Sequence, residues 1–203
     1  MKNKKTRTIT RLAVLIAIIA IMSFTPLGYI RTAGLEISFL MIPVAIGAVT
    51  IGPWGGLVLG CVFGITSFIQ CFGMSAFGTT LFGISPLGTF VVCFVSRALA
   101  GLLSGLIYKW LSKPWKPLPA TILGCLAAPV FNTVFFMGTL VLFFYNTEYI
   151  RGIAEALGTS NPLAFIAAFV GIQGVVEAVV CTVVSVPICM AIAKYSKNST
   201  AGG

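Results

Sequence analysis

Apolar residues occur along the chain in long runs separated by short polar segments, and this alternation is the clearest pattern in the sequence. A helix needs about 20 mainly apolar residues to cross the hydrocarbon core of a bilayer. The runs that approach this length predict an all-α membrane protein, a bundle of six transmembrane helices. The predicted spans are residues 11–30, 35–51, 54–72, 86–108, 119–144 and 162–193.

Two of these runs are less regular than the others. The second is short, contains Pro43 and starts beside Glu36, whereas the last is long enough to tilt or to begin with an interfacial segment. The first run lacks a small-residue cleavage site, so we expect a retained span and not a signal peptide. No polar block between the runs is long enough to fold separately, and residues 1–203 are expected to form a single integral-membrane domain.

Composition supports the membrane interpretation. Hydrophobic residues make up 58% of the chain, charged residues only 8%, and the mean hydropathy is +1.06. These values exclude an ordinary soluble globular domain.

Charge placement indicates the topology, because short cytoplasmic loops collect lysine and arginine. With the N-terminus inside and the short second run counted as a span, both termini are cytoplasmic. The net charge of +9 then reflects topology and attraction to anionic membrane lipid, and no nucleic-acid partner is expected. The predicted inner segments hold ten of the thirteen basic residues: Lys2, Lys4, Lys5, Arg7, Arg11, Lys109, Lys113, Lys116, Lys194 and Lys197.

The residues that catalysis usually requires are scarce. The chain has no histidine, no aspartate and four glutamates, and its six cysteines form no C-x-x-C pair. We interpret the cysteines as small buried hydrophobes. No nucleophile, base or metal constellation emerges, so we expect no enzyme activity, no metal site and no cofactor.

Polar groups inside the apolar runs are costly in hydrocarbon and therefore mark candidate functional positions. Arg97 and Gln173 lie about 16 Å below the outer ends of their helices at 1.5 Å per residue, and Asn132 lies about 20 Å below. Glu177 is one turn deeper than Gln173 on the same helix face. These four side chains can share one level of the bundle.

Two accounts of that level stay open. In one, Arg97 and Glu177 form a structural pair that fixes helix packing; in the other, the four groups form the floor of a solute site open to the outside. The two accounts are compatible, because a pair can both brace helices and contact a ligand. The predicted outer loops, residues 25–36, 71–88 and 146–161, are rich in glycine, small polar and aromatic residues and could close such a site. They and the adjoining helix ends contribute four further candidate binding residues: Gln70, Phe77, Ser85 and Glu36.

Rows of small residues predict close helix packing. Gly56, Gly60 and Gly64 recur every four residues, and Gly101 and Gly105 do the same in the fourth span, which we assign to packing within the chain. Ala13 and Ala17 form a third row on the first span. From spacing alone, its partner is a helix of this chain or of another protein.

Taken together, these features resemble the substrate-binding membrane subunits (S-components) of energy-coupling factor (ECF) vitamin importers, of the riboflavin and pantothenate type. The likeness extends over the six spans, the basic N-terminus and the row of Ala13 and Ala17. Its most specific part is the segment LEISFLMIPVAIGAVTIGPWGGLVLGCVFGITSFIQ.

The resemblance implies a prokaryotic plasma-membrane protein that captures a vitamin-sized molecule or related heterocycle from outside with high affinity. Its partners would be a transmembrane coupling protein, faced by Ala13 and Ala17, and two cytoplasmic ATPase subunits. The identity of the solute stays open, because Arg97 suits a carboxylate whereas Glu177 suits an amine or ring N–H. A self-sufficient secondary transporter that uses Glu177 for proton coupling is the alternative.

Overall fold

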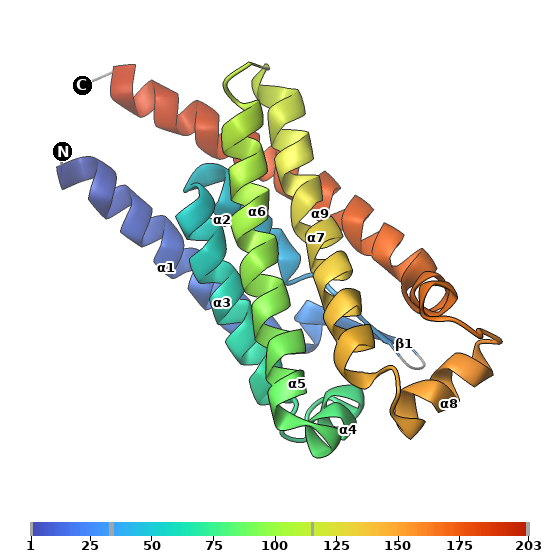
Figure 1. The fold of residues 1–203 in the computed structure, drawn as a ribbon. Helices are drawn as coiled ribbons and strands as arrows, with labels where there is room; N and C mark the ends of the chain where they lie inside the picture. Colours follow the sequence, from blue (N-terminus) through green and yellow to red (C-terminus); the bar gives the residue numbers. More distant parts are fainter. Residues whose placement is uncertain (1, 33–34, 115, 202–203) are drawn as a thin grey trace.

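The computed structural model describes residues 2–32, 35–114 and 116–201 and shows an elongated helical bundle (Figure 1). Its shorter elements gather toward one end of the bundle. These are the 3-10 helix η1 (Pro26–Gly28), strands β1 (Tyr29–Thr32) and β2 (Leu35–Ser38), and helices α4 (Ala76–Ile84), α5 (Pro86–Phe90) and α8 (Glu148–Ala156). The longer elements are α1 (Lys2–Phe24), α2 (Met41–Thr50), α3 (Pro53–Gln70), α6 (Ser96–Leu111), α7 (Pro117–Phe144) and α9 (Pro162–Ala201). A π-helical turn, η2 (Val91–Val95), joins α5 to α6.

Within the described residues, five helical segments are long and apolar enough to cross a membrane: Lys5–Phe24, Pro53–Gln70, Pro86–Leu111, Pro117–Phe144 and Gln173–Ser196. These segments correspond to five of the predicted spans. The protein is therefore an α-helical, multi-pass membrane protein.

The predicted second span, residues 35–51, is wrong as a single transmembrane helix. Its first part forms strand β2, and only the ten residues of α2 are helical. Eight of these ten residues are buried, because α2 lies inside the bundle and not against lipid. The described residues thus hold five long apolar helices and, in place of a sixth, this short internal helix.

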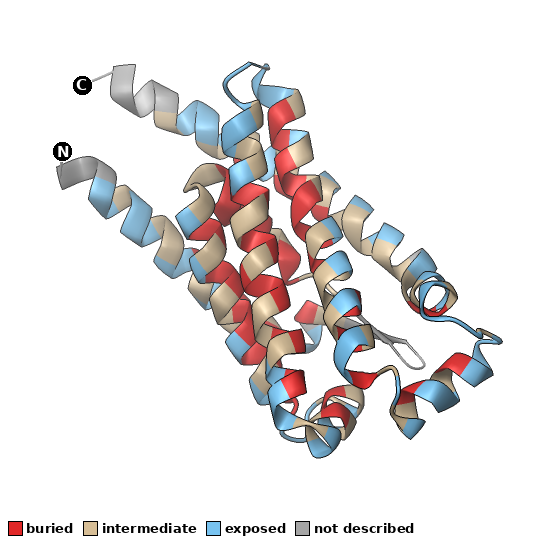
Figure 2. Cartoon of the chain, viewed as in Figure 1, coloured by how far each residue is buried: buried red, intermediate tan, exposed pale blue. Residues whose placement is uncertain are grey.

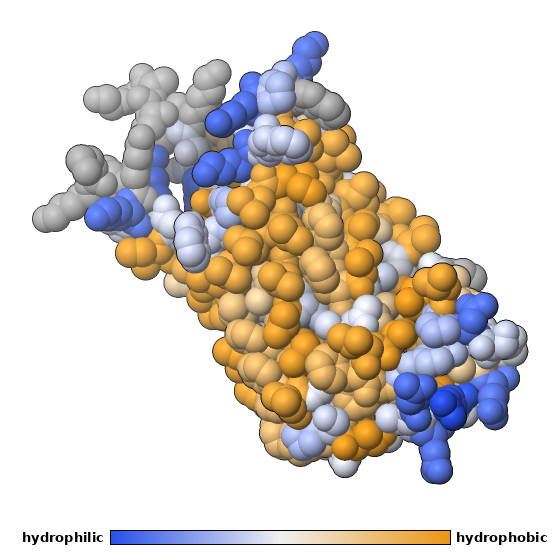
Figure 3. All heavy atoms as spheres, viewed as in Figure 1, coloured by the Kyte–Doolittle hydropathy of each residue, from blue (hydrophilic) through white to orange (hydrophobic). Residues whose placement is uncertain are grey.

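The start of α1, the end of α9 and the loop between α6 and α7 lie at the same end of the bundle (Figure 1). The hairpin and α2 together thus return the chain to that end, as the charge pattern requires. Hydrophobic atoms form a broad band between this end and the opposite one, where α8 contributes hydrophilic residues (Figure 3).

The best-packed contact is the α3–α6 seam, which we define by Gly56, Gly60 and Gly64 on α3 and Gly101 and Gly105 on α6. A Cβ atom added to Gly64 would lie 2.8 Å from the Phe94 Cα, and one added to Gly105 would lie 2.6 Å from the Pro53 Cα. Only glycine permits such backbone contact. The predicted packing role of these two glycine rows is confirmed.

The two strands form an antiparallel hairpin, in which Tyr29 is paired with Ser38 and Arg31 with Glu36 in register. The Phe39 N–H donates to the Gly28 carbonyl at 2.9 Å, which fixes the base of the hairpin to η1. Strand β2 also contacts α9, so the hairpin lies beside that helix.

Buried residues are coloured red in Figure 2, and the buried apolar side chains form two clusters. One surrounds α2 and includes Leu40, Val44, Leu59 and Phe63. The other lies between α7, α8 and the outer part of α9 and includes Phe144. The space between the two clusters is lined by Phe63 of the first and by Leu81, Val92 and Met137 of the second.

Candidate solute-binding site

A cavity of about 340 Å³ occupies this space. Its wall combines residues of the hairpin, of helices α3, α4, α7, α8 and α9, and of the η2–α6 junction. The polar residues of the wall are Tyr29, Ser38, Ser67, Gln70, Cys71, Ser75, Cys93, Arg97, Asn132, Thr133, Tyr149, Gln173 and Glu177.

Arg97 is the buried cation of this cavity. It is the second residue of α6, after the π-helical turn, and its Nη1 donates to the carbonyl groups of Val92 and Cys93, each at 3.0 Å. Its guanidinium carbon lies 4.9 Å from the ring centre of Phe63 and 5.4 Å from that of Phe136, distances at which cation–π attraction acts. The Nε atom is buried and has no hydrogen-bond partner. A donor is thus left available beside the cavity.

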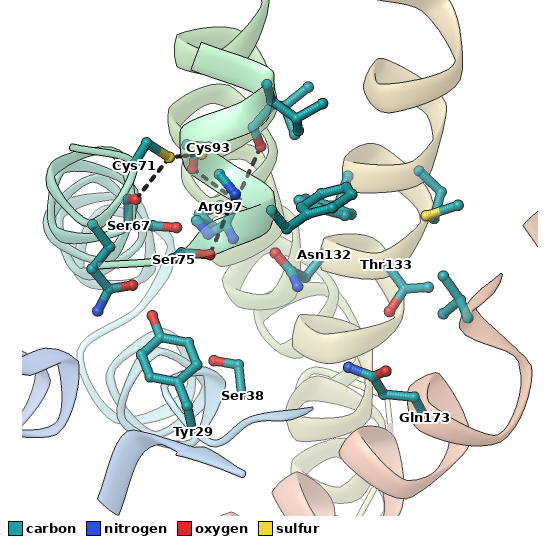
Figure 4. Close-up of a pocket in the computed structure, with 18 of the residues that line it drawn as sticks. Tyr29, Ser38, Ser67, Cys71, Ser75, Cys93, Arg97, Asn132, Thr133 and Gln173 are labelled. Carbon is teal, nitrogen blue, oxygen red and sulfur yellow. Dashed lines mark hydrogen bonds between the residues drawn. The ribbon is translucent and has the colours of Figure 1, made fainter. Parts of the chain in front are cut away.

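Asn132 supplies a complementary acceptor. Its side chain is buried in the middle of α7, and its Oδ1 atom has no hydrogen-bond partner. Buried polar atoms without partners are rare in native proteins and call for an explanation such as a bound molecule. Figure 4 shows Asn132 beside Arg97, with Gln173 of α9 on the opposite side of the cavity.

Glu177 has a partner that the sequence did not suggest. Its Oε1 accepts a hydrogen bond of 2.6 Å from the backbone N–H of Ser38, the last residue of β2. Arg97 donates to carbonyl groups of η2 and Glu177 accepts from the hairpin, so neither of these hydrogen bonds joins the two residues, although the charge of Arg97 still acts on the Glu177 carboxylate. The carboxylate instead attaches the hairpin to α9.

Phe77 presents an aromatic face at the α4 side of the cavity. Its ring centre lies 6.1 Å from that of Tyr149 on α8 and 5.9 Å from that of Phe169 on α9. Ser75 caps α4 by accepting from the Gly78 N–H at 3.3 Å. Local capping and aromatic contacts therefore hold α4 and α8 together over the cavity.

The structure brings together six of the eight binding residues predicted from the sequence. Ser85 is placed elsewhere, because its hydroxyl accepts from the Gly88 N–H at 3.2 Å and caps α5. Glu36 belongs to β2, but its side chain lies outside the described residues. The six that line the cavity are Arg97, Asn132, Gln173, Glu177, Gln70 and Phe77.

Sequence analysis missed the residues that reach the cavity from short elements. Tyr29 and Ser38 belong to the hairpin, whose period-two alternation in LEIS was the available signal. Cys93 lies in the π-helical turn and Ser75 caps α4. Neither position has a distinctive local pattern.

Ala13 and Ala17 are both exposed, whereas Leu15 and Ile19 of the same helix are buried. The alanine row therefore faces away from the bundle. The spacing of Ala13 and Ala17 left two possible partners, a helix of this chain or a helix of another protein. Because both alanines are exposed, no helix among the described residues of this chain covers them.

Comparison with known proteins gives two findings. Residues 7–189 match the family described as "ECF transporter, substrate-specific component". The chain is also similar to the pantothenic acid transporter PanT of Lactococcus lactis subsp. cremoris (strain MG1363), at 26% identity over 98% of this chain and 100% of that protein.

Proposed function

The chain belongs to the family of ECF transporter substrate-specific components, and from that premise we propose that it captures pantothenate, or a vitamin with the same polar groups, in the cavity around Arg97. Capture occurs from outside the cell. The bound vitamin is then taken up with a transmembrane coupling protein and two cytoplasmic ATPase subunits.

The observation that carries this proposal is the pair of unpartnered polar atoms at the cavity. The Arg97 Nε is a donor and the Asn132 Oδ1 is an acceptor, and both are buried. A bound molecule with an acidic group and a hydroxyl or amide would satisfy both atoms.

Pantothenate has this combination of groups, with one carboxylate, one amide and two hydroxyls. In the proposed pose its carboxylate lies at Arg97, and its amide and hydroxyls lie toward Asn132 and Gln173. The cavity, at about 340 Å³, falls at the lower end of the range typical of small-molecule sites. The similarity to a pantothenic acid transporter supports this choice of solute.

The proposed orientation follows the positive-inside rule. The end that holds the loop from Lys109 to Lys116 faces the cytoplasm, and both chain termini face it too. The cavity then opens on the external side, beneath α4, α8 and the hairpin. The exposed row of Ala13 and Ala17 provides the docking face for the coupling protein.

The first experiment is mass spectrometry of small molecules that co-purify with the detergent-solubilised protein, followed by calorimetric titration with pantothenate and a panel of other vitamins. We expect one stoichiometric ligand with an affinity between nanomolar and low micromolar. Tight binding of a different vitamin would replace pantothenate as the solute. No binding across the panel, together with proton-driven uptake by vesicles that contain the protein alone, would establish the secondary-transporter alternative instead.

The docking face has a separate test. Ala13→Trp and Ala17→Trp place a large ring on a lipid-exposed surface, remote from the cavity. We expect solute affinity to stay unchanged while ATP-dependent uptake in vesicles with the partner subunits is lost. Normal uptake by both variants would remove the proposed coupling face.

A further inference from the structure

Two cysteine thiols meet in the wall of the cavity. The Cys71 Sγ at the end of α3 lies 3.7 Å from the Cys93 Sγ in the π-helical turn η2 (Figure 4). Both side chains are buried from bulk solvent, yet both line the cavity. Neither has a role in the proposed capture of the solute.

A second thiol pair in the same chain provides an internal reference. Cys125 on α7 and Cys189 on α9 have Sγ atoms 3.9 Å apart, and both side chains are buried in the apolar cluster around α2. Neither residue is part of the cavity wall. The two pairs are therefore alike in spacing and burial and differ in whether a small molecule in the cavity can reach them.

We propose that Cys71 and Cys93 form an oxidation site, at which a peroxide entering the cavity converts the two thiols into a disulfide. The proposal takes the external opening of the cavity from the proposed function, because the outside of a cell supports disulfides and the cytosol does not.

The chemistry needs only the two thiols and the peroxide. The thiolate of one cysteine attacks a peroxide oxygen, the O–O bond breaks, and a sulfenic acid and one water form. The second thiol then attacks the sulfenic sulfur, so that the S–S bond forms and a second water leaves. Two electrons pass from the thiols to the peroxide, and both thiol protons end in water.

Geometry permits the bond with a small movement. The two sulfur atoms are already within 3.7 Å, and rotation about the side-chain bonds has to bring them to the disulfide distance of about 2.0 Å. The disulfide would tether the end of α3 to η2. The same residue of η2 holds Arg97, since the Cys93 carbonyl accepts from its Nη1.

The α4 helix is also affected by this movement. A Cβ atom added to Gly78 would lie 2.7 Å from the Cys71 Sγ, so α4 packs directly on this thiol. The thiol pair consequently lies where α3, α4 and the holder of Arg97 meet. Oxidation would fix these three elements relative to one another and change the cavity that the solute enters.

The test treats the purified, detergent-solubilised protein with increasing hydrogen peroxide, alkylates the remaining thiols and maps the peptides by mass. We expect a Cys71–Cys93 cross-link at peroxide concentrations that leave Cys125 and Cys189 as thiols, and we expect dithiothreitol to reverse it. Equal oxidation of the two pairs, or oxidation of Cys93 without a cross-link, would overturn the proposal. Cys71→Ser and Cys93→Ser should each abolish the cross-link, and Cys125→Ala should retain it.

Pantothenate then serves as the probe of access. At a concentration about ten times its Kd, about a tenth of the cavities are empty, so cross-linking should slow about tenfold. Binding in the calorimeter without protection would overturn the placement of the thiol pair in the solute cavity. If pantothenate neither binds nor protects while the cross-link still forms, the proposed solute fails and the oxidation site stands.

Discussion

The α3–α6 seam and the wall of the cavity share helices α3 and α6 but are built on opposite principles. Along the seam, backbone touches backbone, and a Cβ added to Gly64 or Gly105 has no space. Around the cavity, Arg97 and Asn132 keep buried atoms without partners, and about 340 Å³ stays unfilled. The seam is fully packed by the protein itself, whereas the cavity holds buried polar atoms that a bound solute would satisfy.

The two regions meet on the same residue. A Cβ added to Gly60 would collide with the Arg97 backbone carbonyl, so the seam holds the backbone of Arg97 in place while its side chain faces the cavity. A fixed backbone keeps the charged group in the geometry that binding needs and lowers the ordering cost on binding. The tightly packed α3–α6 seam therefore positions the Arg97 side chain at the cavity.

The largest expected effect comes from breaking the seam. Gly56→Leu pushes a side chain into the backbone of Gly101, and overpacking of this kind costs about 1–3 kcal/mol or more. Since the contact is with backbone, we expect loss of the folded, monodisperse protein. Size-exclusion chromatography with thermal unfolding in detergent measures this.

The matched control is Gly138→Leu on α7. Gly138 is exposed, and no atom lies within 4 Å of its added Cβ. We expect wild-type thermal stability, because the new side chain meets lipid or detergent. Equal destabilisation by both substitutions would show that the seam contact does not govern the result, because leucine has the higher helix propensity and meets no atom at position 138.

The difference between the two regions also explains what the sequence could predict. Long apolar runs and glycine spacing depend on local pattern, so five spans and close packing at the two glycine rows were predicted, but not that the two rows face each other. The hairpin was missed because residues 35–38 are apolar enough to extend the following run, and period-two alternation over four residues is a weak signal. The hairpin in turn gives Glu177 its partner, so the Arg97–Glu177 pairing could not be judged without it.

Depth counting was more successful for the cavity. Arg97, Asn132 and Gln173 were assigned to one level from the 1.5 Å rise alone, and all three line the cavity. Ser85 was not predictable, because its side chain can face the cavity or cap the next helix, and capping of α5 decided its orientation. The cavity residues that come from α4 and η2 could not be predicted in this way, because no spacing rule in the sequence places these short elements.

Removing the charge of the cavity should cost most of the solute affinity and little of the fold. Arg97→Met keeps an apolar stem beside Phe63 and Phe136 but removes the donor to a carboxylate, an interaction of about 1.5–3 kcal/mol. We expect calorimetry to show pantothenate binding weakened about tenfold to a hundredfold. Arg97→Lys should fall between, since it keeps the charge without the planar fork. Unchanged affinity in folded Arg97→Met would exclude Arg97 from the site.

Neutral polar residues of the cavity should give smaller losses. Asn132→Ala and Gln173→Ala each remove one hydrogen-bonding side chain, worth about 1 kcal/mol, which corresponds to about a fivefold weaker affinity. Asn132→Ala strands no partner of Oδ1, because this atom has none within the protein, whereas Gln173→Ala also removes a hydrogen bond to Glu177, which keeps the Ser38 N–H as its donor. Calorimetry at matched protein stability provides the measurement. Wild-type affinity in both variants would show that the solute does not contact α7 and α9 at this level.

The smallest effect is expected for Glu177→Gln, and this variant separates the two roles considered for that residue. An amide oxygen still accepts the Ser38 N–H, so the hairpin stays attached and solute affinity should change by less than about twofold, whereas Glu177→Ala removes the acceptor and should weaken binding by about 1 kcal/mol. Uptake with the partner subunits should follow the same order.

A carboxylate that carried protons would behave differently, because Gln cannot titrate: uptake would stop in Glu177→Gln while binding persisted. Retained uptake in that variant therefore assigns Glu177 to holding the hairpin on the open region of the molecule.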